Sequence, residues 1–145
     1  MDEHQSAHSN FHTLLIIVLG QALDAAGYRL DERRVQWAGG RFRFSKRLET
    51  GFCTAIEFQH LGYRDTEWSS GVPSRFQVTL QRDELRRTLG ALVVDDFGVA
   101  ILPSSDHWWM YRDMEELGLA LAEAGHLIVG YGLPWLQGEL EPPSG

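Results

Sequence analysis

Residues 41–60, RFRFSKRLETGFCTAIEFQH, decide the fold class of this chain. Phe42 and Phe44 alternate with polar residues, and the same alternation returns from Phe52 to His60 after a glycine-containing turn. Such alternation is typical of a strand with one apolar and one solvated face, and a short turn between two such segments is typical of an antiparallel hairpin. This stretch therefore predicts two neighbouring antiparallel strands.

Segments on both sides extend the predicted sheet. Residues 75–81, RFQVTLQ, alternate again after a polar loop, and residues 35–37, VQW, lead into a two-glycine turn at Gly39-Gly40. Residues 108–111, WWMY, have the composition of a further strand. We therefore expect an antiparallel meander with one apolar face and one solvated face.

Two segments with helical spacing flank this sheet. Over residues 10–26 apolar side chains recur every three or four positions, and Gly27 follows as a natural C-terminal cap. Asp113 and Glu116 have the spacing of a capping box, and a second apolar stripe follows as far as Ile128. The sequence thus predicts an α+β domain, with an antiparallel sheet of about four to six strands flanked by an N-terminal and a C-terminal helix.

The segment over residues 83–103 carries mixed signals. Residues 83–87, DELRR, have the composition of a helix start, whereas residues 91–94, ALVV, and 99–102, VAIL, have that of short strands. We expect a short helix followed by a strand or an extended connection that ends at Pro103.

Length and composition indicate one globular domain over residues 1–145, with loose termini at 1–9 and 139–145. The chain of 145 residues is 43% hydrophobic and 23% charged, which is ordinary for a folded domain. A single cysteine cannot form an intramolecular disulfide and indicates a reducing compartment. The longest apolar segment, residues 14–19, is too short to span a membrane, and its N-terminal flank is acidic where a secretion signal is basic. We expect a cytoplasmic protein without a membrane partner.

Charge is unevenly distributed along the chain, whose net charge is −7. Residues 1–87 hold 12 of the 13 basic residues against 11 acidic ones, whereas residues 88–145 hold Arg112 against nine acids. Because general nucleic-acid binding needs a positive surface, we expect no nucleic-acid partner. A basic protein partner stays open.

No motif for catalysis, metal binding or cofactor binding stands out. Cys53 lacks a basic neighbour along its strand, which favours a packing role over a reactive thiolate, although a histidine distant in sequence stays open. His4, His8 and His12 would lie along one side of a helix, but no carboxylate completes a metal-ligand pattern. Neither a phosphate-binding loop nor a dinucleotide fingerprint is present in the sequence. We expect no catalytic residue, no metal site and no cofactor.

Two features are candidate binding sites. Arg41 and Arg43 lie on the solvated side of their strand, where they bind an anion or acidic partner, or else protect the sheet from edge-to-edge aggregation. The long loop over residues 61–74 contains Tyr63, Arg64 and Trp68. Arginine and aromatic residues are enriched at protein interfaces, and the alternative is a compact structural loop.

The order of features resembles a known family. Its landmarks are the first helix ending in Gly27-Tyr28, the alternating phenylalanines, Trp108-Trp109 before an acidic helix, and YGLPWL at residues 131–136. Together they are similar to the bacterial proteins grouped as domain of unknown function 4304. The resemblance implies a small α+β domain without an established activity, and it implies that the two tryptophan-bearing segments are structural.

These observations lead to a non-enzymatic binding or protein-interaction domain as the main hypothesis. One concrete form is an immunity or antitoxin-like protein, in which an acidic surface neutralises a basic toxin. The alternative is a small hydrolase or transferase in which His60, His107, Glu57 and Arg64 converge in a deep pocket. A structural homodimer is a third option and requires an exposed apolar patch.

Overall fold

An antiparallel sheet forms the centre of the computed structural model, which describes residues 3–62 and 73–143, with side chains from residue 7 onward. Its strands follow the order β1-β2-β3-β4-β5, and β6 also pairs with β4. The strand bounds are β1 Arg29–Leu30, β2 Arg41–Arg47, β3 Cys53–Leu61, β4 Ser74–Arg82, β5 Leu85–Thr88 and β6 Trp109–Tyr111. The α+β class and the antiparallel sheet expected from the sequence are confirmed.

Alternation along the three long strands sorts their side chains between the two faces of this sheet. The register places Phe42 opposite Phe58, and Phe58 opposite Val78, so that their side chains share one face. All three side chains are almost fully buried. The polar residues between them point to the other side, and burial of the apolar face is the main force that fixes the strand register.

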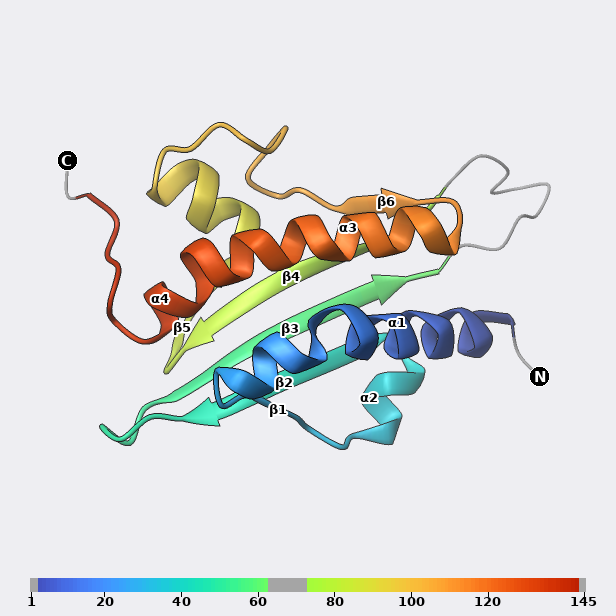
Figure 1. Ribbon diagram of the computed structural model, residues 1–145, viewed down its shortest axis with the longest axis horizontal. Helices are drawn as coiled ribbons and strands as arrows, with labels where there is room; N and C mark the ends of the chain where they lie inside the picture. Colours follow the sequence, from blue (N-terminus) through green and yellow to red (C-terminus); the bar gives the residue numbers. More distant parts are fainter. Residues whose placement is uncertain (1–2, 63–72, 144–145) are drawn as a thin grey trace.

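Helices cover the apolar face. The bounds are α1 Glu3–Ala25, α2 Arg34–Ala38, η1 Ala91–Asp96, α3 Met114–Leu127, η2 Ile128–Gly132 and α4 Leu133–Leu136. Figure 1 shows α1 and α3 running across the same side of the sheet, and they contact each other. The other side of the sheet, which we call the outer face, is covered by none of the described helices.

Capping residues mark the start of α3 and the end of α1. The Asp113 side chain accepts a hydrogen bond from the backbone N–H of Glu116 at 2.8 Å, which confirms the expected cap at the start of α3. Gly27 has a φ of 91°, as a helix-ending glycine requires. Helix α1 begins at Glu3 instead of near residue 10, so His8 lies within the helix.

The helical segment Met114–Leu136 is long and apolar enough, by length and composition, to cross a membrane. Its apolar stripe is nevertheless occupied within the fold, because Leu117, Leu121 and Leu127 belong to the hydrophobic core. Trp135 and Leu136 are also buried there, as expected for the C-terminal segment. This is the arrangement of a core helix in a globular domain.

Three local predictions were wrong. Residues 35–37 were expected to be a strand but belong to the short helix α2, because three residues are too few for their spacing to distinguish a strand from a helix. Residues 83–87 were expected to start a helix, but Asp83 adopts a left-handed turn with a φ of 56° and β5 follows as a strand paired with β4. Residues 91–94, expected to be a strand, lie in η1. Residues 99–102 form no strand, which leaves the expected alternative of a connection that ends at Pro103.

Candidate functional site

Three arginines surround one carboxylate on the outer face. Strand register places Arg43 directly opposite Glu57, while Arg41 lies on the same strand and Arg86 comes from β5. Each guanidinium approaches the Glu57 carboxylate, with N–O distances of 3.2 Å for Arg41, 3.5 Å for Arg43 and 3.7 Å for Arg86. We call these four residues the arginine cluster.

Neighbouring polar groups hold the cluster in place. The Gln81 side-chain oxygen accepts hydrogen bonds from Arg43 at 3.1 Å and from Arg86 at 3.0 Å. The carboxylate of Asp31, which accepts from the Ser45 hydroxyl at 2.6 Å, also lies 3.7 Å from Arg43. Because several partners fix these guanidinium groups, their donor directions are set before any ligand arrives.

The outer face is positive although the chain as a whole is negative. Within the described part of the chain, Glu57 and Asp31 are the carboxylates in contact with the three arginines of the cluster. Strand alternation and register place six arginines on this face among the described residues: Arg29, Arg41, Arg43, Arg47, Arg75 and Arg86. The side chains of Arg41 and Arg86 are 53% and 49% exposed, so their charge reaches solvent.

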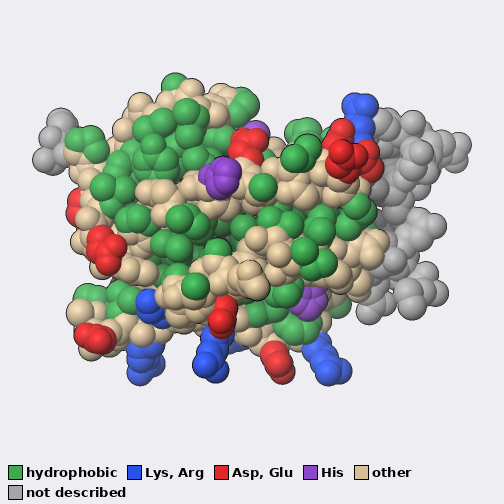
Figure 2. Space-filling view, in the orientation of Figure 1, with side chains coloured by type: hydrophobic (Ala, Val, Ile, Leu, Met, Phe, Trp, Pro, Cys, Tyr) green, Lys and Arg blue, Asp and Glu red, His purple; other side chains and the backbone are tan. Residues whose placement is uncertain are grey.

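Apolar groups are scarce on this face. Of the large hydrophobic side chains that are exposed within residues 7–62 and 73–143, the register places only Met110 on the outer face. Figure 2 looks at the helical side, where hydrophobic side chains are exposed over much of the surface. A ligand on the outer face would therefore meet charged and amide groups, whereas one on the helical side would meet apolar groups.

The predicted site residues divide into two groups. Arg41 and Arg43 lie together in the arginine cluster, and Arg86, which was not among the predicted site residues, joins them. The segment that contains Arg86 was predicted to start a helix but forms strand β5, so the position of Arg86 on the sheet could not be predicted. Tyr63, Arg64 and Trp68 lie outside the described residues.

A second polar constellation lies inside the core. His60 is completely buried on the helical side of β3, and its Nδ1 is 2.8 Å from Nδ1 of His8 in α1. Its Nε2 is hydrogen-bonded to the Tyr111 hydroxyl, which in turn is hydrogen-bonded to Ser74. The ring of Phe11 stacks on that of His60 at 4.5 Å between centroids. We call His8, His60, Tyr111 and Ser74 the histidine chain.

Burial determines the charge state of this chain. Desolvation, together with the charge of His8, lowers the pKa of His60 to about 3. Burial raises the pKa of Tyr111 to about 12, and the hydrogen bond to Ser74 opposes that rise. His60 is therefore neutral at physiological pH, with one ring nitrogen donating and the other accepting. Its low pKa makes it a weak general base, and it fixes α1 against the sheet.

The pocket expected for the enzyme alternative does not form from the described residues. Glu57 and His60 are three positions apart on one strand, so they point to opposite faces of the sheet. His107 lies elsewhere, with its ring 4.7 Å from that of Trp109, and burial lowers its pKa. Arg64, the fourth residue, falls outside the described part of the chain.

Cys53 is exposed on the outer face, and the register places it opposite Arg47. A basic neighbour, which the sequence analysis had excluded along its own strand, thus comes from β2. Among the described residues there is no group of three or more histidine, cysteine, aspartate or glutamate side chains that could hold a metal ion.

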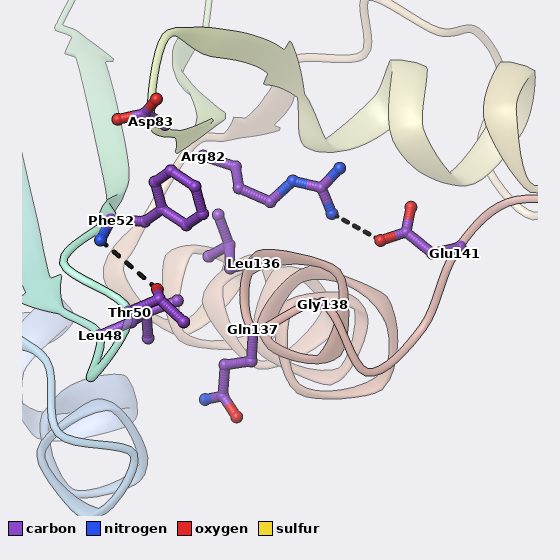
Figure 3. Close-up of a pocket in the computed structure, with 9 residues that line it drawn as sticks. All are labelled: Leu48, Thr50, Phe52, Arg82, Asp83, Leu136, Gln137, Gly138 and Glu141. Atoms are coloured by element: carbon purple, nitrogen blue, oxygen red, sulfur yellow. Dashed lines mark hydrogen bonds and ion pairs between the residues drawn. The ribbon is translucent and has the colours of Figure 1, made fainter.

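A hollow of about 430 Å³ opens between the β2–β3 turn, the β4–β5 turn and α4 (Figure 3). Phe52 and Leu136 give it apolar walls, and Arg82 is the cation that lines it. The guanidinium of Arg82 lies 4.5 Å from the ring of Trp135 and donates to Glu141 at 2.9 Å. The cation of this hollow is therefore already paired within the chain.

The chain has no significant match to any protein-family model, curated protein or solved structure. The resemblance to domain of unknown function 4304 thus stays a prediction, and the geometry of the surface is the basis for the function.

Proposed function

We propose that this protein is a non-enzymatic binding domain whose outer face binds a carboxylate-rich segment of a protein partner. The observation that carries the proposal is the arginine cluster on an uncovered and polar sheet face. Guanidinium groups pair with carboxylates through two parallel hydrogen bonds, which gives both affinity and orientation. The lone cysteine, which forms no disulfide within the chain, supports a cytoplasmic location for this binding.

Protection against aggregation is a weaker explanation for the cluster. Such protection places charges on strands whose backbone edge is open. Strand β2 is internal at this point, because β1 pairs with its residues Phe44 and Ser45, and the backbone N–H of Asp31 bonds to the carbonyl of Arg43. Arg43 also projects from the face of the sheet and not along an edge.

An acidic protein fits this face better than a nucleic acid does. Single-stranded nucleic acids bind to basic surfaces that also offer aromatic rings for stacking. Between its arginines, the described part of the outer face carries serine, threonine, glutamine and alanine side chains. The ring of Trp108, at the rim of this face, lies 5.0 Å from the Arg75 guanidinium and is therefore already in contact with a cation. The net charge of −7 would also repel an extended polyanion that ran beyond this face.

The immunity-like form of the hypothesis would place a basic toxin on the acidic C-terminal half. Several carboxylates of that half already have internal partners, because Asp96 pairs with Arg87 and Glu141 pairs with Arg82. Glu116 accepts from the backbone N–H of residue 112. These pairings reduce the unpaired negative charge of that half. On the outer face, in contrast, the arginines outnumber the carboxylates that contact them, which favours the outer face as the binding surface.

A titration followed by NMR tests the proposal. The ¹⁵N-labelled protein is titrated with a synthetic 12-residue peptide of alternating glutamate and serine, with its glutamine counterpart, and with a single-stranded oligonucleotide. We expect the glutamate peptide alone to shift amide signals of β2 to β5. The Arg41→Gln/Arg86→Gln variant should weaken binding about tenfold, since two exposed ion pairs contribute up to about 1 kcal/mol each.

Arg112→Gln is the matched control, because Arg112 is exposed and lies outside the sheet. It should leave both the shifts and the affinity unchanged. Binding of the oligonucleotide at equal or higher affinity, or equal losses in both variants, would contradict a carboxylate-binding outer face. Thermal unfolding of each variant confirms that the fold is intact.

A further inference from the structure

A separate hollow of about 340 Å³ lies between the first half of α1 and the short helix α2, and we call it the α1–α2 pocket. His8, Ser9 and His12 line it from α1, while Arg34 and Trp37 line it from α2 and Phe42 from β2. Phe42 is on the helical side of the sheet, so this pocket is distinct from the outer face. Its volume falls within the range of small-molecule sites.

Aromatic rings form one wall of the α1–α2 pocket. The His12 ring lies 4.7 Å from the Trp37 ring and 5.0 Å from the Phe42 ring, measured between centroids. Burial lowers the pKa of His12, so this imidazole is largely neutral at physiological pH. The wall therefore offers flat and mostly uncharged surface of the kind on which a planar ring stacks.

Apart from His8, which is hydrogen-bonded to His60, the polar side chains of the pocket are donors without a partner among the described residues. The side chains of Ser9, His12 and Arg34 form no hydrogen bond or ion pair with any described residue, and the described lining includes no carboxylate. The hollow of Figure 3 differs in this respect, because its Arg82 is paired with Glu141. A guanidinium beside an aromatic wall, without an internal carboxylate, is suited to an anionic group on an aromatic ligand.

The pocket wall is held rigidly from behind. His8 is anchored through its Nδ1 to the buried His60. The turn from α2 into β2 approaches so closely that a Cβ on Gly40 would lie 2.7 Å from Cε1 of His8. Gly40 has a φ of 82°, and its carbonyl accepts from the His60 backbone N–H at 2.7 Å. The histidine chain and Gly40 together preorganise this side of the pocket, which lowers the cost of binding.

We propose that the α1–α2 pocket binds a small organic anion that carries a flat ring, either an aromatic carboxylate or an aromatic phosphate monoester. The anionic group pairs with Arg34 and accepts from Ser9, and the ring stacks against the partly exposed rings of Trp37 and His12. This ligand site is independent of the proposed protein-binding face, so either can be wrong without the other.

Calorimetry and NMR on the full chain test this site with four probes. Benzoate and phenyl phosphate represent the two ring-bearing anions, inorganic phosphate supplies charge without a ring, and benzyl alcohol supplies a ring without charge. We expect at least one ring-bearing anion to bind and to shift the Trp37 indole N–H signal. The one that binds more tightly identifies the anionic group, and the two partial probes should bind at least tenfold more weakly.

Arg33 provides a matched control, because it is an exposed arginine directly before Arg34 that does not line the pocket. Arg34→Gln should weaken binding at least tenfold, whereas Arg33→Gln should leave it within twofold. The proposal is overturned if neither anion binds at 10 mM, if inorganic phosphate binds equally well, or if both variants lose affinity to the same extent. Shifts confined to the hollow around Arg82 would also overturn it.

Discussion

Replacing His60 by phenylalanine tests how the buried histidine couples stability to pH. In the folded protein its pKa is about 3, against an ordinary value of 6.5 in the unfolded chain. Below pH 6.5 the unfolded state therefore binds a proton that the folded state does not, and stability falls as the pH falls. At pH 5 the pH is 1.5 units below the pKa of the unfolded histidine. The free energy of unfolding is therefore about 2 kcal/mol lower at pH 5 than at pH 8.

The variant His60→Phe removes this contribution and keeps a ring that can stack on Phe11. It loses the bonds to His8 and Tyr111, so we expect it to be about 1–3 kcal/mol less stable than the parent at pH 8. Between pH 8 and pH 5 it should lose about 2 kcal/mol less than the parent. The pKa values of His12 and His107 are also lowered, but both residues are present in each protein and cancel in the comparison.

Urea unfolding followed by tryptophan fluorescence at pH 5, 6, 7 and 8 gives the free energy of unfolding for both proteins. We expect the free energy of unfolding of the parent, minus that of the variant, to fall by about 2 kcal/mol between pH 8 and pH 5. Parallel curves would refute the reasoning, because they would mean that His60 titrates alike in the folded and unfolded states.

Three further predictions concern single residues and are read from thermal or urea unfolding. Gly40→Ala should destabilise the fold by about 2–4 kcal/mol, because it strains a left-handed backbone and crowds His8; a loss below 0.5 kcal/mol would show that the turn can move. Asp113→Ala should lower the free energy of unfolding by about 1 kcal/mol through loss of the α3 cap, whereas Asp113→Asn should keep most of the stability that the cap provides. Glu141→Gln should change stability by less than about 1 kcal/mol, since its ion pair is half exposed, and a larger loss would mean that the C-terminal segment contributes to the core.

The sequence predicts the parts of this fold whose signals are long. Strict alternation around Phe42 and Phe58 identifies β2 and β3, and helical spacing followed by Gly27 identifies α1. These patterns extend over several residues and agree with the burial that tertiary packing requires. The cap at Asp113 is a local hydrogen bond and could also be predicted.

Short segments were beyond such reasoning. Helix α2 covers only Arg34–Ala38, and one helical turn places Trp37 inward as well as a strand would. In β5 the charged residues favour a helix locally, but pairing with β4 overrides that preference. Because both segments were misassigned, neither the α1–α2 pocket nor the contribution of Arg86 to the arginine cluster could be found.

The histidine chain could be predicted from the sequence only in part. Alternation alone places His60 on the apolar face, and a polar residue at such a position signals a buried hydrogen-bond network. Its partners come from segments as distant as His8 and Tyr111, and only the folded chain brings them together. The spacing of His8 and His12 would place both on one side of a helix extended to the N-terminus, and in the structure, where α1 begins at Glu3, both residues line the same pocket.

Site-specific cross-linking tests the proposed protein-binding face most directly. A photo-reactive benzoylphenylalanine is introduced at Thr79, which lies on the outer face of β4, or at Leu119, which is exposed on α3. Each protein is irradiated in nuclease-treated extract of the organism that encodes it, and adducts are identified by mass spectrometry.

The account predicts a discrete protein adduct at position 79 that is absent at position 119. Arg41→Gln/Arg86→Gln should reduce the yield of this adduct about tenfold. Arg112→Gln should leave it intact, and the cross-linked partner peptide should be rich in aspartate and glutamate. An adduct that forms equally at both positions, that is undiminished in the double variant, or that fails to form at position 79 would contradict a carboxylate-binding outer face.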